Sequence, residues 1–175
     1  IMGWGICGAR GFASALKVDC LVILLPICRH LLTIIRGLPV PLLKHIPWDS
    51  AIDFHKIVGG TILVNSLGHT LCHFINFANF SVSPRVLWNA SVLSERSGMP
   101  FEPTFLDYAA TVPACTGLAM LTIMAIAYPF THSTIRNKSF NKFWITHNLF
   151  YLWICALLIH GTRSIFEPST AWAWV

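Results

Sequence analysis

The sequence predicts an all-α fold, a bundle of membrane-spanning helices that forms a single domain over residues 1–175. The first observation behind this prediction is composition: 55% of the residues are hydrophobic and only 11% are charged. A mean hydropathy of +0.64 is typical of helical membrane proteins. The second is a series of apolar runs, each long enough to cross a hydrocarbon core about 30 Å thick. The third is a pair of histidines inside each of two such runs.

We expect four full spans and the beginning of another. Pro26 should kink the first span, because proline removes a backbone donor and clashes with the preceding turn. The third span contains no charged residue. The expected spans cover residues 2–36, 50–80, 108–130 and 142–165, with a further span starting at 169–175.

The loops between the spans predict an orientation. Residues 131–142 carry Arg136, Lys138 and Lys142 with no acid, whereas the loop at 81–107 has at least as many acids as bases. Because basic residues concentrate in cytoplasmic loops, we expect 37–50 and 131–142 to face the cytoplasm.

Other classes of function are disfavoured by the same sequence. The net charge of +5 does not indicate a nucleic-acid partner, since no basic cluster interleaved with aromatic residues lies outside the spans. The six cysteines contain no C-x-x-C and lie mostly in apolar runs, so we expect reduced packing residues. No EF-hand loop is present.

Histidines inside membrane spans are rare and indicate a functional site. His55 and His69 lie 14 residues apart (69 − 55), which is within roughly 40° of four complete turns and gives a rise of roughly 21 Å. His147 and His160 lie 13 apart (160 − 147). We expect two stacked haems, with His55 and His147 on the inner iron and His69 and His160 on the outer iron. The alternative is that each histidine forms only an interhelical hydrogen bond.

The spacing of the second pair leaves two alternatives open. A spacing of 13 places two side chains roughly 140° apart on an ideal helix. Either the helix is kinked or overwound between His147 and His160, or the two imidazoles reach their haems from different sides of it. His73, one turn beyond His69, is expected not to be a ligand.

Three arginines in the first span are candidates for binding haem propionates, because a guanidinium pairs well with a carboxylate. We assign Arg10 to the outer haem, and Arg29 and Arg36 to the inner haem. Arg36 has an equal alternative as an interfacial residue whose charge reaches toward water. Trp153 lies six residues after His147, at mid-depth, where it would either pack between the haems or only fill volume.

These residues lie in segments that carry a resemblance. LVILLPICRHLLTIIRG, DFHKIVGGTILVNSLGHTLCHF and SFNKFWITHNLFYLWICALLIHG resemble the transmembrane ferric-reductase domain of the NADPH oxidases. IPWDSAIDFHK, FSVSP and TVPACTG most resemble the calcium-regulated branch, which includes the dual oxidases. By position, the chain resembles the second to fifth of the family's six spans and the start of the sixth.

The resemblance implies two b-type haems bound by the four histidines, and electron transfer to molecular oxygen on the outer side, producing superoxide or hydrogen peroxide. It implies that Arg10 and His73 border the site of oxygen reduction, and that Trp153 lies between the haems. The electrons would come from a cytosolic FAD- and NADPH-binding dehydrogenase domain. We recognise no such domain here, so we expect that the chain alone does not oxidise NADPH. A cell-membrane location is implied. The alternative function is a ferric-chelate reductase or a cytochrome b-type electron carrier on the same scaffold.

Overall fold

The computed structural model describes all residues except 1–2, 42–44, 46–47, 92–99 and 163–175. The described residues form helices and turns and contain no strand, which confirms the all-α fold. The chain divides into two compact units, residues 3–74 and residues 75–175 together with 1–2, and each unit is described by itself. The expected further span at 169–175 lies outside the described residues.

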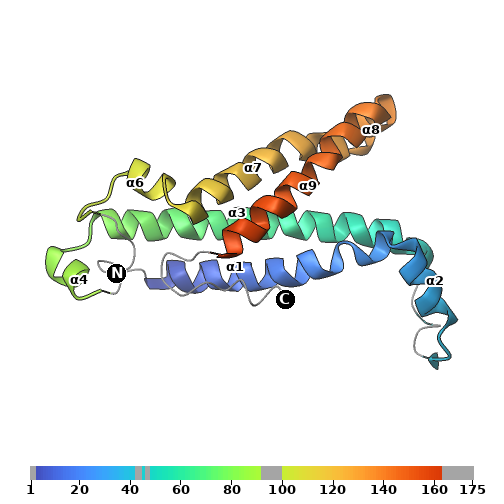
Figure 1. The fold of residues 1–175 in the computed structure, drawn as a ribbon, viewed down its shortest axis with the longest axis horizontal. Coiled ribbons are helices and arrows are strands. Elements are labelled where there is room, and N and C mark those ends of the chain that lie inside the picture. The colour runs from blue at the N-terminus through green and yellow to red at the C-terminus, as the bar shows by residue number, and fades with distance from the viewer. Residues whose placement is uncertain (1–2, 42–44, 46–47, 92–99, 163–175) are drawn as a thin grey trace. The chain divides into compact units, whose positions relative to one another are not determined.

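The first unit is built on two long helices that run side by side (Figure 1). These are α1 (Gly3–Val22) and the first part of α3 (Ala51–Ser81). Three short elements lie between them: η1 (Leu25–Ile27), α2 (Arg29–Gly37) and η3 (Trp48–Ser50).

The first predicted span breaks at Pro26, where a kink was expected. Pro26 lies in the short 3₁₀ turn η1, and the helical segments on either side of the break differ in direction by 82°. Proline carries no N–H, so it cannot donate to a carbonyl of the preceding turn. The region 2–36 is therefore two helices with a sharp bend instead of one gently kinked helix.

Glycines allow α1 and α3 to approach closely. A Cβ atom added to Gly68 would lie 2.6 Å from Cζ of Phe12, and one added to Gly8 would lie 2.7 Å from Sγ of Cys72. Both distances are shorter than van der Waals contact. Small residues serve this purpose at helix interfaces in membranes, where packing replaces the hydrophobic effect as the source of association.

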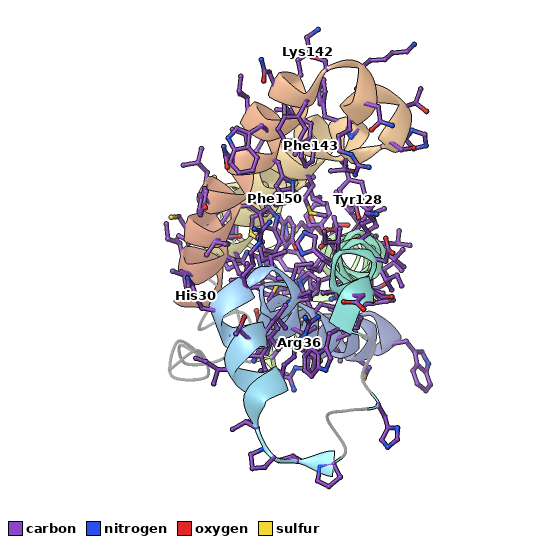
Figure 2. All side chains as sticks on the ribbon, turned by 90° about the vertical axis from the view of Figure 1, so that its right-hand side faces the viewer. His30, Arg36, Tyr128, Lys142, Phe143 and Phe150 are labelled. Atoms are coloured by element: carbon purple, nitrogen blue, oxygen red, sulfur yellow. The ribbon has the colours of Figure 1, made fainter. Side chains whose placement is uncertain are left out.

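The second unit contains an antiparallel pair of long helices, α7 (Val112–Thr131) and α9 (Phe140–Thr162) (Figure 1). The basic segment 131–142 was expected to be a loop, but it includes the short helix α8 (Ser133–Lys138). The imidazole Nδ1 of His132 accepts the Thr134 N–H at 3.4 Å and so caps this helix. Lys142 lies at the end of α9 that adjoins α8 (Figure 2).

The segment before α7 holds an aromatic cluster made by Phe80, Trp88 and Tyr108. Two short helices contribute to it, α4 (Arg85–Asn89) and α6 (Phe105–Ala109). Burial raises the pKa of Tyr108 to about 12.

A capping box begins α6. The Asp107 carboxylate accepts from the Thr104 hydroxyl at 2.7 Å and from the Thr104 N–H at 2.8 Å, while the Asp107 N–H donates back to that hydroxyl at 3.3 Å. These hydrogen bonds from Thr104 hold the pKa of Asp107 below its usual value, since they stabilise the charged carboxylate.

Two described helices, α7 and α9, are long and apolar enough to cross a membrane, and the bent pair of α1 and α2 would make a third. Large apolar side chains on α9 are exposed, among them Ile145 and Leu152, and such a surface is suited to lipid. The 31-residue α3 carries several polar side chains, and its role as a span stays a prediction. The chain is an integral membrane protein by its helices and composition.

Candidate functional site

His55 is held by a backbone carbonyl that the helix break leaves available. Its Nδ1 lies 2.9 Å from the carbonyl oxygen of Ile23. Within a continuous helix this carbonyl would accept from residue 26 or 27, but Pro26 has no N–H and the Ile27 N–H donates to Leu24 at 3.3 Å. A carbonyl can only accept, so the proton is on Nδ1 and the lone pair of the neutral ring is on Nε2.

His69 is held in the same way at the other end of the pair. Its Nδ1 lies 2.9 Å from the carbonyl oxygen of Ala9, a residue that is only 2% exposed. Gly8 and Gly68, the glycines that bring α1 and α3 together, immediately precede Ala9 and His69. The close approach of the two backbones therefore explains how an imidazole reaches a main-chain carbonyl of the neighbouring helix.

The two hydrogen bonds have matched spacing. His55 and His69 are 14 residues apart (69 − 55), and so are their acceptors Ile23 and Ala9 (23 − 9). The pairs run in opposite order along the chain, as antiparallel helices require. Both imidazoles therefore leave α3 on the side that faces α1, which confirms the prediction that they share one face.

Arg10 and His73 lie at the same end of the α1–α3 pair. Arg10 follows Ala9, and His73 is one turn beyond the histidine that Ala9 accepts from. The His69 and His73 rings meet edge to face, with centroids 4.5 Å apart and planes at 81°. The structure thus brings together a cation and two imidazoles that the sequence assigned to the outer side.

The other two arginines lie on α2, where both are exposed. The Arg36 guanidinium is 3.5 Å from the Asp49 carboxylate and lies over the Trp48 ring at 5.8 Å. These partners belong to the connector before α3, as expected for the alternative assignment of Arg36 as an interfacial residue. Arg29 stands at the first position of α2.

On α9, aromatic rings surround His147. The Phe143 ring stacks on the imidazole with centroids 5.1 Å apart, and the Phe150 ring meets it edge to face at 5.3 Å (Figure 2). Trp153 follows one turn later and is 5% exposed. Its buried indole N–H has no hydrogen-bond partner among the described residues.

His160 contacts α7 through a side chain. Its Nδ1 lies 2.9 Å from the hydroxyl oxygen of Thr116, and a Cβ added to the adjacent Gly117 would lie 3.4 Å from Cε1 of the imidazole. Because α9 is an unbroken α-helix from Phe140 to Thr162, a kink between His147 and His160 is disfavoured. The two imidazoles leave α9 in directions that differ by roughly 140°.

Sequence reasoning missed the groups that hold these imidazoles, namely Ala9, Ile23 and Thr116. Two of them act through backbone atoms, which leave no mark in the residue type. The signal for Thr116 was a hydroxyl beside a glycine inside an apolar helix, a combination common where membrane helices touch.

The donor chemistry of these residues fits a haem. Neutral imidazoles bind haem iron through one nitrogen while the other donates to an acceptor of the protein. For His55 and His69 a backbone acceptor puts the proton on Nδ1 and so leaves Nε2 as the ligating atom. The pairing of each α3 histidine with one on α9 stays a prediction.

Comparison with known proteins identifies the class to which this membrane protein belongs. Residues 11–158 match the family described as "Ferric reductase like transmembrane component". Because this match covers most of the chain, the chain belongs to that family. The heavy chain of a superoxide-generating NADPH oxidase from Dictyostelium discoideum is 34% identical over 176 residues, covering 100% of this chain and 33% of that protein.

Human dual oxidases are also similar. Dual oxidase 1 is 34% identical over 167 residues, and dual oxidase 2 is 33% identical over 170 residues. These alignments cover 93% and 95% of this chain but 11% of each oxidase. The predicted resemblance to the NADPH oxidases and dual oxidases is therefore confirmed, and the chain spans one third or less of the length of these relatives.

Proposed function

We propose that this chain is the membrane part of an NADPH oxidase and carries electrons across the bilayer to molecular oxygen. The observation that carries the proposal is the state of the α3 histidines: each donates from Nδ1 to a carbonyl of the first unit, so each presents Nε2 as a ligand. The relatives add support, since each bears the name of an oxidase.

Four histidines would hold two b-type haems: His55 with His147, and His69 with His160. Bound haem supplies one-electron redox chemistry at iron. The protein supplies neutral imidazoles of fixed tautomer, and aromatic surface on α9 from Phe143, Phe150 and Trp153. Trp153, buried at mid-depth between the α9 histidines, would fill the space between the two haems.

Charged groups at either end of the first unit would then have distinct roles. Arg10 and His73 would stabilise the negative charge that forms when oxygen is reduced, because cationic and N–H groups favour a developing anion in a site of low polarity. Arg29 is proposed to bind propionates of the inner haem, together with Arg36, whose present partner is Asp49. Electrons would come from a cytosolic dehydrogenase domain that binds FAD and NADPH.

A ferric-chelate reductase is the second candidate, and the description of the matching family favours it. The two functions share the haem ligands and differ in the acceptor. Reoxidation of the dithionite-reduced protein by oxygen, compared with reoxidation by ferric citrate, separates them. Faster reaction with the ferric chelate would favour the second candidate.

The test of the proposed function is haem content. The protein purified from membranes should hold two haems per chain by the pyridine haemochrome assay, and His69→Leu or His160→Leu should each hold one. His30→Leu is the control, since His30 is an exposed residue of α2 that we do not assign to a haem. A wild-type ratio of one, or equal losses in all three variants, would overturn the proposal.

A further inference from the structure

Thr116 receives a hydrogen bond from the neighbouring helix in addition to its own helical one. The Thr116 hydroxyl oxygen lies 2.7 Å from the Val112 carbonyl, 3.2 Å from the Pro113 carbonyl and 2.9 Å from Nδ1 of His160. We propose that Thr116 is a positioning residue for the outer haem, and that it fixes His160 as an Nε2 ligand. This inference rests on the proposed function of His160.

Proton accounting decides the direction of the hydrogen bond. The hydroxyl has one hydrogen, and the carbonyl of Val112 can only accept. With the hydroxyl hydrogen directed to Val112 at 2.7 Å, the oxygen offers its lone pairs to His160 at 2.9 Å. The chain of donors then runs from His160 Nδ1–H to the Thr116 oxygen, and from the Thr116 hydroxyl to the Val112 carbonyl.

This order has a chemical consequence for the imidazole. A proton held on Nδ1 leaves the lone pair on Nε2, which is the form that binds a metal. An acceptor at Nδ1 also makes the ring a better electron donor and fixes its rotation. Ligation by His160 therefore favours the ferric state more strongly when Thr116 is present than when it is absent.

A hydroxyl bonded to the carbonyl four residues earlier is common in helices and is by itself only local. Thr122, on the same helix, makes that bond to Leu118 at 2.9 Å and is exposed. Thr116 differs because an imidazole of α9 contacts the same oxygen, and because Gly117 beside it leaves room for the ring and no more. The contact between helices, not the local bond, identifies the positioning role.

The experiment compares Thr116→Val with Thr116→Ser and with Thr122→Val in the haem-loaded protein. Valine has nearly the size of threonine but no acceptor, serine keeps the acceptor, and Thr122→Val removes an equivalent local bond. We expect Thr116→Val to weaken retention of one haem about 10- to 100-fold, as loss of a hydrogen bond to a ligand does elsewhere. One of the two midpoint potentials should also rise, while Thr116→Ser and Thr122→Val should resemble the wild type.

The outcomes separate this inference from the proposed function. If His160→Leu loses one haem but Thr116→Val keeps both haems and both potentials, Thr116 is only a packing residue and the inference fails. If His160→Leu loses no haem, the proposed ligand set fails instead. Should Thr116→Val accumulate poorly, Thr116→Cys is used, since a thiol is a weak acceptor of similar size. An unshifted potential in that variant would also overturn the inference.

Discussion

The two units of the molecule hold their imidazoles by different means. In the α1–α3 pair, His55 and His69 donate to main-chain carbonyls, whereas in the α7–α9 pair His160 contacts a threonine side chain. A main-chain acceptor cannot be deleted by substitution, but it depends on where the helix breaks and how closely the backbones approach. A side-chain acceptor depends on one residue. The same ligand chemistry is therefore sensitive to different kinds of mutation in the two units.

The largest effect is expected from Gly68→Val, because a Cβ at this position would lie 2.6 Å from the Phe12 ring. Separating α1 from α3 should cost about 1–3 kcal/mol of stability through overpacking, and should lengthen the bond from His69 to Ala9. Thermal unfolding in detergent and haem content measure the two effects.

The matched control for this variant is Gly60→Val on the same helix, where an added Cβ meets nothing within 4 Å. If both variants melt together and keep equal haem, close approach does not set the position of His69.

Asn65→Leu tests whether a side-chain bond matters between the two anchored histidines. Asn65 donates to the Asp19 carboxylate at 2.8 Å, and loss of a hydrogen bond to an acidic side chain should cost about 1.5 kcal/mol or more. Since His55 and His69 are held by carbonyls, both haems should remain after this loss. Chemical unfolding together with the absorption spectrum checks the prediction. Haem loss at unchanged stability would contradict the comparison between the units.

Pro26→Ala restores a backbone N–H near the Ile23 carbonyl, where it would compete with His55. We expect retention of the inner haem to weaken about tenfold, the lower end of the range for such partners. Redox titration of both haems measures which one changes. Pro129→Ala, which removes the proline inside α7, serves as the control and should leave the inner haem unaltered. An equal shift in both variants would show that general helix straightening is responsible.

The smallest effect concerns Asp107, whose folded pKa is lowered by the hydrogen bonds from Thr104. A carboxylate with a lowered folded pKa stabilises the fold above its unfolded pKa, and this contribution is lost as pH falls through the folded value. Stability of the second unit should therefore decline slightly with acid in the wild type and less in Asp107→Asn. Unfolding measured between pH 7 and pH 3 checks the slope. Identical slopes would remove the capping box from the account.

The sequence predicted the helical class, the break at Pro26 and the shared face of His55 and His69. These features follow from composition, from the chemistry of proline and from helical period, which are all local properties. The acceptors could not be predicted, because they depend on which carbonyl a break leaves available and on which helices touch. Thr116 and Thr122 look alike in the sequence, and only the position of α9 distinguishes them. The helix α8 was missed because its capping group is the imidazole of His132.

The equal spacing of 14 residues on α1 and α3 limits which lengths these helices can have. Deleting one residue between Ala9 and Ile23 would turn one carbonyl by about 100° relative to the other and move it about 1.5 Å along the axis. One histidine would then keep its acceptor while the other lost it. Insertions and deletions in this part of the chain should thus survive only as compensating pairs, one in each helix, so that the two helices measure the same distance.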